Sequence, residues 1–229
     1  RVPAGQQIVI HDMVRGDVVF DSAGIGDFVI VKSDGIPTYN YAVVIDDALM
    51  HITHVIRAEE HLSNTPRQSL IYDALNFEKP IFGHISLILG KDRTKMSKRH
   101  GATSVDQYRK LGYLPEAIVN YLALLGWSPV GEQEFFSLEE LIEQFSMERV
   151  AKSPAVFDVD KLNYISAHYI KKASVEVVTE LAMPHIKEAG YVTDEVSPVQ
   201  KAWLVDVVGL LQEYISHGAE IVQHIDIFF

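Results

Sequence analysis

A basic segment near the middle of the chain holds the side chains best suited to chemistry. Lys91–Gly101 reads Lys-Asp-Arg-Thr-Lys-Met-Ser-Lys-Arg-His-Gly, so five lysines and arginines stand against one acid in a chain whose formal net charge is −11. Ammonium and guanidinium groups at this density can bind a polyphosphate, because they donate charge-assisted hydrogen bonds to its oxygens. Basic runs are more commonly solvated turns, so the composition of the segment leaves both interpretations open.

Arg57 is a second candidate, for binding a carboxylate. It follows the β-branched run Ile52–Ile56, and in open parallel sheets ligands bind at the carboxyl ends of the strands. A guanidinium can hold a carboxylate through two parallel hydrogen bonds, a geometry that lysine cannot match. The alternative is an ion pair with Glu59 or Glu60, which follow closely in the sequence.

Other reactive patterns are weak. Asp46 and Asp47 are more typical of helix capping and turn formation than of a metal pair, and the ten histidines show no spacing typical of metal ligands. Ser97 has no partnered base in the sequence, which argues against a nucleophilic serine. The Gly90–Asp92 stretch lacks both the serine or threonine and the earlier glycine of a P-loop. We therefore predict no metal site and no P-loop phosphotransferase.

The N-terminal half must supply the strands that position these residues. Apolar runs separated by turn residues predict a hairpin around Arg15-Gly16 and a strand–helix–strand unit, which is half of a nucleotide-binding sheet. Asn64-Thr65-Pro66 is a strong helix start. The expected strands and extended stretches, with one helix, are Gln7–Asp12, Asp17–Asp21, Phe28–Lys32, Thr38–Ile45, Ile52–Ile56, the helix from Asn64 to Leu75, and Ile85–Leu89.

From Ser104 onward the chain is predicted to be mostly helical. Ser104 with Gln107, and Ser137 with Glu140, have the spacing of capping boxes that open helices. Glycines and prolines mark several of the remaining boundaries. The expected helices are Val105–Leu111, Pro115–Leu125, one that follows Ser137, Asp158–Tyr169, Ser174–Ala189 and Pro198–Tyr214.

The composition is that of a water-soluble globular protein. The chain has 229 residues, 48% hydrophobic and 22% charged, and it has no cysteine, which suits the cytoplasm. No apolar run approaches the roughly 20 residues of a membrane helix. The acidic net charge disfavours indiscriminate binding to nucleic acid, so an RNA partner requires the basic groups to gather on one face. Arg1 at the start and the apolar end Asp226–Phe229 indicate a piece cut from a longer protein.

Several linked segments, in consistent order from about Phe28 to Tyr169, carry a resemblance to a known family. Lys95-Met96-Ser97-Lys98-Arg99 resembles the KMSKS-type loop of class I aminoacyl-tRNA synthetases. The other segments resemble matching parts of bacterial glutamyl-tRNA synthetases, and they are Asp46–Met50, Val55–His61, Leu114–Leu122 and Phe157–Leu162.

The resemblance implies an α/β fold followed by an all-α part. The α/β part is expected to be the second, C-terminal half of a Rossmann-like parallel-sheet catalytic domain, because no His-x-Gly-His (HIGH-type) motif is present and Gly83-His84 lacks the first histidine. The helical C-terminal third departs from the shortened relatives that charge a modified tRNA base and from the glutaminyl enzymes, which carry a β-barrel there. The implied domains are a remnant of the inserted acceptor-binding domain (1–27), the second half of the catalytic domain with its KMSKR loop (28–103), a helical stem-contact domain (104–172) and the start of a helical anticodon-binding domain (173–229).

The resemblance also implies roles for individual residues. Lys98 corresponds to the ATP-contacting lysine of the loop, where an ammonium that reaches the departing pyrophosphate late stabilises the transition state selectively. Lys95 is expected to do the same or to brace the loop, and Met96 to anchor it by packing. Tyr39 corresponds to a tyrosine that contacts glutamate, with a core tyrosine as the alternative. The implied binding residues are Tyr39 and Arg57 for glutamate, and Glu60, His61, Leu87, Ile88 and Lys98 for ATP, Leu87 and Ile88 through their backbone groups.

The implied activity is that of a glutamate–tRNA ligase, which uses ATP with Mg²⁺ to activate glutamate as the adenylate and then transfers it to tRNA(Glu). A monomeric, cytoplasmic protein without membrane contact is expected. The present chain is expected to be inactive alone, because half of the ATP site is missing. The alternative is a non-catalytic tRNA-binding module that retains the KMSKR loop.

Overall fold

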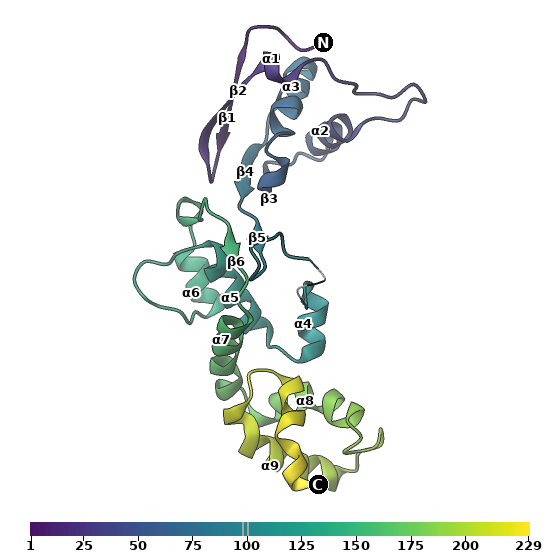
Figure 1. Ribbon diagram of the computed structural model, residues 1–229, viewed down its shortest axis with the longest axis vertical. Coiled ribbons are helices and arrows are strands. Elements are labelled where there is room, and N and C mark those ends of the chain that lie inside the picture. Colours follow the sequence, from purple (N-terminus) through teal and green to yellow (C-terminus); the bar gives the residue numbers. More distant parts are fainter. Residues whose placement is uncertain (98, 100) are drawn as a thin grey trace. The chain divides into compact units, whose positions relative to one another are not determined.

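The computed structural model of the protein describes residues 1–97, 99 and 101–229, so the prediction for Lys98 lies outside the described residues. The chain divides into two units (Figure 1). The first unit consists of Arg1–Leu87 and Ser146–Ala155, and the second of Ile88–Phe145 and Val156–Phe229. Each unit has its own apolar core.

A four-stranded sheet organises the first unit. Its strands are β1 (Gln7–Asp12), β2 (Gly16–Asp21), β3 (His54–Ala58) and β4 (Ile81–Ile85), in the spatial order β2-β1-β4-β3. β1 and β2 are antiparallel, whereas β4 runs parallel to both β1 and β3. The predicted hairpin is confirmed, and Gly16 takes the positive φ of 76° that its turn requires.

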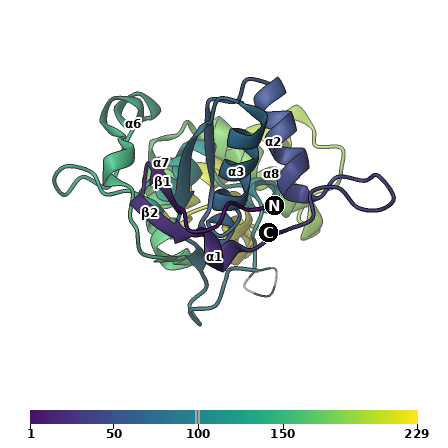
Figure 2. The same ribbon diagram turned by 90° about the horizontal axis from the view of Figure 1, so that it is seen from above.

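Helices cover one face of this sheet. The first unit contains α1 (Ser22–Ile25), α2 (Tyr39–Leu49), α3 (Thr65–Leu75) and the short 3₁₀ segments η1 (Glu59–His61) and η3 (Met147–Arg149). α2 and α3 lie side by side (Figures 1 and 2). α3 connects β3 to the parallel β4, so the predicted strand–helix–strand unit is confirmed. The buried residues between helices and sheet are Ile8, Ile10, Val44, Ile71, Tyr72 and Phe82.

Three expectations for this unit were wrong. Thr38–Ile45 is not extended but enters α2, because packing of Val44 against the core overrides the β preference of this run. Phe28–Lys32 forms only an isolated bridge, between Val31 and Pro37, rather than a strand. The strand expected over Ile85–Leu89 is two elements, β4 ending at Ile85 and β5 (Ile88–Leu89), since the buried part of β4 includes Gly83 and His84, which interrupt the apolar pattern.

The opposite face of the sheet is apolar and open to solvent. Side chains alternate between the two faces of a strand, so the residues that flank the buried ones point away from α2 and α3. Four large aliphatic side chains of β1, β3 and β4 are 39–52% exposed there: Val9, Ile56, Ile81 and Ile85. A parallel sheet normally has both faces covered, so this face is unusual for a finished domain.

The second unit is helical, as predicted. Its helices are α4 (Val105–Leu111), α5 (Pro115–Gly126), α6 (Leu138–Gln144), α7 (Val159–Lys172), α8 (Val175–Glu188) and α9 (Pro198–Leu211). The 3₁₀ segments η4 (Gln212–Tyr214), η5 (Gly218–Gln223) and η6 (Ile225–Phe228) follow. β5 pairs with β6 (Ala155–Val156) in a two-stranded sheet.

The helix starts confirm the capping predictions. Ser104 accepts a hydrogen bond from the backbone of Gln107, and Ser137 from that of Glu140, with the reciprocal bonds of complete capping boxes. Asp158 caps α7. The aromatic cluster formed by α4, α5 and α7 and the aliphatic cluster of α8, α9 and η5 are separate cores. None of the described helices has the length and hydropathy needed to cross a bilayer.

Candidate functional site

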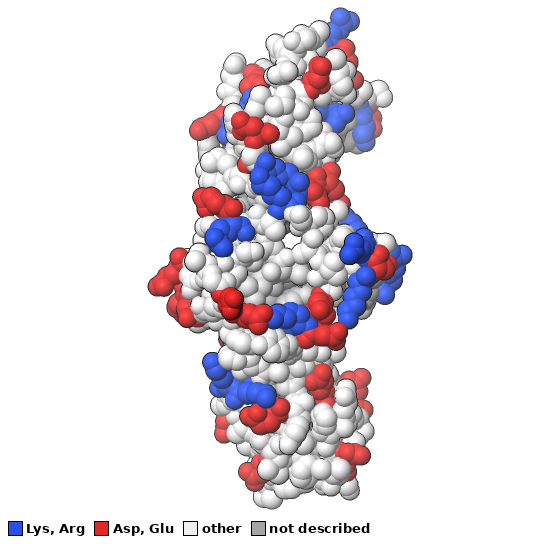
Figure 3. Space-filling view, turned by 60° about the vertical axis from the view of Figure 1, so that its left-hand side comes forward, with Lys and Arg blue, Asp and Glu red and all other residues white. Residues whose placement is uncertain are grey.

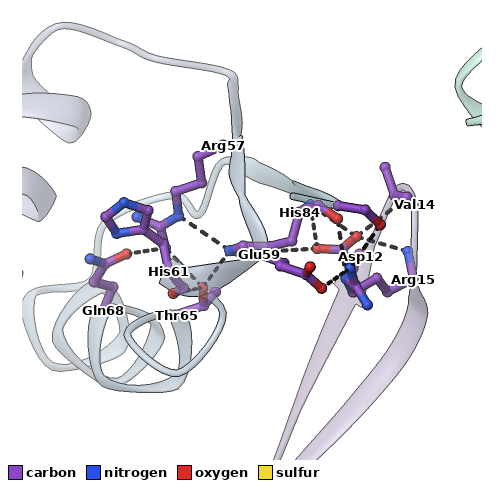
Figure 4. Close-up of polar contacts among 10 residues, drawn as sticks. Asp12, Val14, Arg15, Arg57, Glu59, His61, Thr65, Gln68 and His84 are labelled. Atoms are coloured by element: carbon purple, nitrogen blue, oxygen red, sulfur yellow. Dashed lines mark hydrogen bonds and ion pairs between the residues drawn. The ribbon is translucent and has the colours of Figure 1, made fainter. Parts of the chain in front are cut away.

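Arg57 lies where two parallel strands end side by side. It is the fourth residue of β3 and pairs in register with His84 of β4. Both side chains point to the face that α3 covers, so the guanidinium is half-buried among polar groups of the sheet and helix (Figure 4). The predicted position of Arg57, near the carboxyl end of a parallel strand, is confirmed.

Three neutral acceptors hold the guanidinium of Arg57 (Figure 4). Nε donates to Nε2 of His84 over 3.2 Å, and Nη2 donates to Oγ1 of Thr65 and to Oε1 of Gln68 over 2.8 and 2.7 Å. The amide of Gln68 is fixed in turn, since its Nε2 donates to Oδ1 of Asn40 over 3.0 Å. The orientation of Arg57 is therefore set without any carboxylate.

The positive charge of Arg57 has no ion-pair partner among the residues that the structure describes. The alternative pairing with Glu59 is wrong, because Glu59 forms its ion pair with Arg15. Burial lowers the pKa of Arg57, although interactions with Tyr39 and Asp47 oppose that shift. A half-buried cation whose hydrogen bonds go to neutral groups is costly, and an anion that enters the site relieves the cost.

The structure brings two other predicted residues, Tyr39 and His61, close to Arg57. Tyr39 is the first residue of α2, and its side chain raises the pKa of Arg57 against the effect of burial. The Tyr39 and His61 rings are 6.2 Å apart, centroid to centroid. Tyr39 is 53% exposed, so its alternative interpretation as a core tyrosine is wrong. Oγ1 of Thr65, one of the groups that hold Arg57, lies 3.3 Å from the carbonyl of His61 and 2.9 Å from Nε2 of His84.

Two further residues beside the site were missed from the sequence as parts of it. Burial raises the pKa of Asp47, with Arg57 opposing the shift and Asp46 adding to it. Burial also raises the pKa of Tyr72 to about 12, helped by Asp47. The hydroxyl of Tyr72 is buried and makes no hydrogen bond to any described residue. Both escaped notice because α2 was expected to be extended, so that Asp47 was not placed opposite α3.

Asp46 and Asp47 lie within α2 rather than at its start, so they do not cap it. In the described part of the chain, no group of three or more acidic or histidine residues is arranged to hold a metal ion.

A buried pair, Asp12 and His84, supports Arg57 from the side of the sheet (Figure 4). Oδ2 of Asp12 lies 2.6 Å from Nδ1 of His84, and both side chains are fully buried. Burial alone would raise the pKa of Asp12, but hydrogen bonds from His84, Arg15 and Val14 hold it below its usual value. Burial lowers the pKa of His84, although Asp12 opposes the shift. Neither residue belongs to a recognisable motif, so no pattern in the sequence predicts this pair.

The predicted adenine-contacting backbone groups are already engaged. Leu87 donates its N–H to Glu59 over 3.1 Å and its carbonyl accepts from Ala155, all within the first unit. The carbonyl of Ile88, in the second unit, accepts from the backbone of Met96. Glu60 is an exposed residue of η1. The structure gives no ATP geometry for these positions.

The described residues 91–97 of the basic segment form a turn in the second unit. Lys95 bridges to Leu89, and Gly90 donates its N–H to the carbonyl of Thr94. Met96 is half-buried against the aromatic cluster of α4, α5 and α7, so its predicted packing role is confirmed. Lys91 donates to Asp160 over 2.9 Å.

Arg99 donates to Oγ1 of Thr94 over 2.6 Å and lies 3.5 Å from Asp92. On the face drawn in Figure 3, lysines and arginines stand in small groups among acidic side chains rather than in one continuous patch.

Comparison with known proteins gives consistent results. The family described as "tRNA synthetases class I (E and Q), catalytic domain" matches residues 1–164. The glutamate–tRNA ligase of Desulforamulus reducens is 65% identical over 229 residues, which are 100% of this chain and 48% of that protein. The enzyme of Bacillus subtilis is 50% identical over 231 residues, with the same coverages.

Two solved structures are similar to this chain over its whole length. A glutamate–tRNA ligase of Elizabethkingia meningosepticum, in complex with its amino acid, has 33% identity and a TM-score of 0.84 over 100% of this chain and 48% of its own. The synthetase of Elizabethkingia anophelis has 34% identity and a TM-score of 0.86, over 100% of this chain and 49% of its own. The mixed parallel sheet with helices is thus the expected Rossmann-like fold, and the chain spans about half the length of the relatives it matches.

Proposed function

Since the chain belongs to the class I tRNA synthetases of the E and Q group, we propose that it is part of a glutamate–tRNA ligase, and that its own contribution includes the site for the substrate's carboxylate. The observation that carries the proposal is Arg57, a half-buried guanidinium held by three neutral acceptors and paired with no carboxylate in the described residues. An acidic amino acid supplies the missing negative charge.

In this proposal Arg57 and Tyr39 bind glutamate, while His61, Glu60, Leu87 and Ile88 border the ATP. The electrostatic influence of Tyr39 on Arg57 and the Tyr39–His61 ring contact support a shared pocket within the first unit. The α-carboxylate of glutamate attacks the α-phosphorus of ATP, and pyrophosphate leaves.

Lys98 and Lys95 stabilise the charge that develops on the leaving pyrophosphate. Mg²⁺ is expected on the phosphates of ATP rather than on a cluster of protein ligands, since the described residues contain no such cluster.

The whole protein is proposed to transfer the glutamyl group to tRNA(Glu), as a cytoplasmic monomer. We assign residues 1–27 to a remnant of the acceptor-binding domain, 28–103 to the second half of the catalytic domain, 104–172 to the stem-contact domain and 173–229 to the start of the anticodon-binding domain. The separate aromatic and aliphatic cores of the second unit support a division of its helices into two groups. Assignment to the second half of the catalytic domain stays a prediction.

The test is ATP–pyrophosphate exchange by the full-length protein, with tRNA present. Exchange should require glutamate and fail with glutamine. Lys98→Ala should lower the rate by about 10²-fold or more, because it removes charge stabilisation from the transition state. Lys110→Ala is the matched control, since Lys110 pairs with Asp106 on the exposed side of α4. Exchange that proceeds equally well with glutamine would contradict the proposal.

The 229-residue chain alone is expected to show no exchange. Robust exchange by this chain would show that it contains a complete ATP site. Binding of tRNA by the full-length protein without any exchange would instead favour the non-catalytic RNA-binding module. Filter binding with Lys95→Ala and Lys98→Ala variants would then show whether the KMSKR loop contacts the RNA.

A further inference from the structure

The buried pair behind Arg57 has no part in the proposed substrate contacts. Asp12 ends β1 and His84 lies in β4, 72 positions apart in the sequence. Both side chains are 0% exposed. Placing a carboxylate and an imidazole in the core is costly, and apolar side chains of similar volume are often as stable there. Packing alone therefore does not account for this pair.

The hydrogen bonds of His84 favour one tautomer of its ring. The carboxylate of Asp12 accepts from the backbone N–H groups of Val14, Arg15 and His84, at 2.9, 2.9 and 3.1 Å, and from Nδ1 of His84 at 2.6 Å. An ionised carboxylate only accepts, so Nδ1 carries the proton. Nε2 of His84 lies 3.2 Å from Nε of Arg57, which only donates, and 2.9 Å from Oγ1 of Thr65, whose hydroxyl can also donate. Nε2 therefore offers its lone pair to both groups. The ring is the neutral Nδ1–H tautomer, which agrees with the lowered pKa of His84.

The three bonds to His84, Thr65 and Gln68 do not use Nη1 of Arg57, although the side chain of Tyr39 also hydrogen-bonds the guanidinium. Nε is held by His84, and both N–H groups of Nη2 are held by Thr65 and Gln68. None of these three acceptors takes the two N–H groups of Nη1. If Nε2 of His84 carried a proton, it would donate to Oγ1 of Thr65, and Nε of Arg57 would lose its acceptor.

We propose that Asp12 and His84 are positioning residues for the amino-acid substrate, and that Asp12 sets the tautomer of His84 so that its Nε2 orients Arg57. The proposal rests on the proposed function, in which Arg57 binds the carboxylate of an acidic amino acid. It adds a chain of three residues, from β1 through β4 to β3, that presents the Nη1 edge of the guanidinium to that carboxylate.

Asp12→Asn tests the first link. Asparagine keeps the shape of the side chain, but its amide can donate to Nδ1 and so favour the Nε2–H tautomer, which opposes Arg57. In the full-length protein, Asp12→Asn should raise the KM for glutamate in pyrophosphate exchange by about tenfold or more, with the KM for ATP unchanged. An equal change in both KM values, or in neither, would overturn the proposal.

His84→Gln and His84→Leu test the second link as a matched pair. The two replacements have similar volume, but only glutamine offers an acceptor that can reach Nε of Arg57. His84→Gln should therefore recover part of the glutamate affinity that His84→Leu loses, and equal loss in both variants would overturn the positioning role. Asn120→Leu is the control for damage to a buried polar network, since Asn120 is fully buried in the second unit and bonds to Phe136 and Tyr169. It should lower stability without changing the KM for glutamate.

Nitrogen-15 NMR of the 229-residue chain tests the tautomer independently of activity. In the wild-type chain at neutral pH, Nδ1 of His84 should be protonated and Nε2 should not, and Asp12→Asn should reverse this. A protonated Nε2 in the wild-type chain would overturn the inference. If the full-length protein fails to exchange pyrophosphate with glutamate, the proposed function fails, whereas the NMR result still decides whether Asp12 sets the tautomer.

Discussion

At the scale of single residues, several polar side chains hydrogen-bond one arginine. Arg57 receives the acceptors of Thr65 and Gln68 from α3 and that of His84 from β4. The neighbouring Arg15, by contrast, forms an ion pair with Glu59. Leaving Arg57 unpaired keeps its charge for a ligand.

Replacing Arg57 by lysine tests this at the same scale. Lysine keeps the positive charge but cannot donate to His84, Thr65 and an anion in one plane. Arg57→Lys in the full-length protein should raise the KM for glutamate by about 10- to 100-fold with little change for ATP, measured by pyrophosphate exchange. Arg67→Lys, on α3, is the control, because Arg67 bonds only to the carbonyl of Ser63 among the described residues. A similar effect of both changes would contradict the special role of Arg57.

The sequence identified the residues that belong to linear motifs and missed those that only the sheet brings together. Arg57 was predicted from its place after a β-branched run, and Tyr39 and His61 from the resemblance to a family. The structure places all three within one unit. Asp12 and His84 are far apart in the chain and become neighbours only when β1 and β4 pair. Glycine and histidine in β4 broke the apolar pattern, so neither the strand nor the pair was predicted.

At the scale of elements, the end of α4, helix α8 and η5 meet at glycines. The N–H of Gly218 donates to the carbonyl of Gly112 over 3.0 Å. A Cβ atom at position 218 would lie 2.3 Å from the carbonyl oxygen of Leu181 in α8, which is well inside van der Waals contact. The absence of a side chain at Gly218 therefore allows these backbones to approach.

Gly218→Ala should therefore destabilise the second unit by about 3 kcal/mol or more, because backbone rather than a flexible side chain blocks the new methyl group. The measurement is urea unfolding of the 229-residue chain. Gly126→Ala is the matched control. Position 126 closes α5 and has open space around it, so alanine there should be neutral or slightly stabilising. Equal stability of the two variants would show that α8 yields to the methyl group.

Helices were predicted better than strands for a physical reason. Capping boxes at Ser104 and Ser137 and the proline at the start of α5 are local signals, and local hydrogen bonds form them. A strand exists only if a partner pairs with it, so the β-branched run Val29–Val31 stays irregular and Tyr39–Ile45 becomes helical.

At the scale of the whole molecule, the division into two units lets one of them be observed alone. Both tryptophans, Trp127 and Trp203, belong to the second unit, so tryptophan fluorescence reports its unfolding. This unit also contains a largely buried histidine, His217, whose side chain is 12% exposed. Its ring stacks on Tyr113 with 4.4 Å between centroids, and its Nδ1 lies 3.1 Å from the carbonyl of Leu111.

The second unit should lose stability as the pH falls below about 6.5. Burial lowers the pKa of His217, with His185 adding to the shift and Glu220 and the Leu111 carbonyl opposing it. The unfolded chain therefore binds a proton on His217 more readily than the folded one, so the free energy of unfolding decreases through this range. Urea unfolding followed by tryptophan fluorescence, at about pH 7.5 and about pH 5.5, checks the direction. His217→Gln should flatten the difference, and an unchanged difference in that variant would assign it to other groups.

The bare aliphatic face of the sheet, formed by Val9, Ile56, Ile81 and Ile85, has a consequence for how this chain behaves in solution. In dilute buffer the net charge of −11 keeps molecules apart. Sulfate screens that repulsion and strengthens the burial of apolar surface at the same time. The chain should therefore salt out at lower sulfate concentration than a protein of the same charge whose parallel strands are sandwiched between two helical layers.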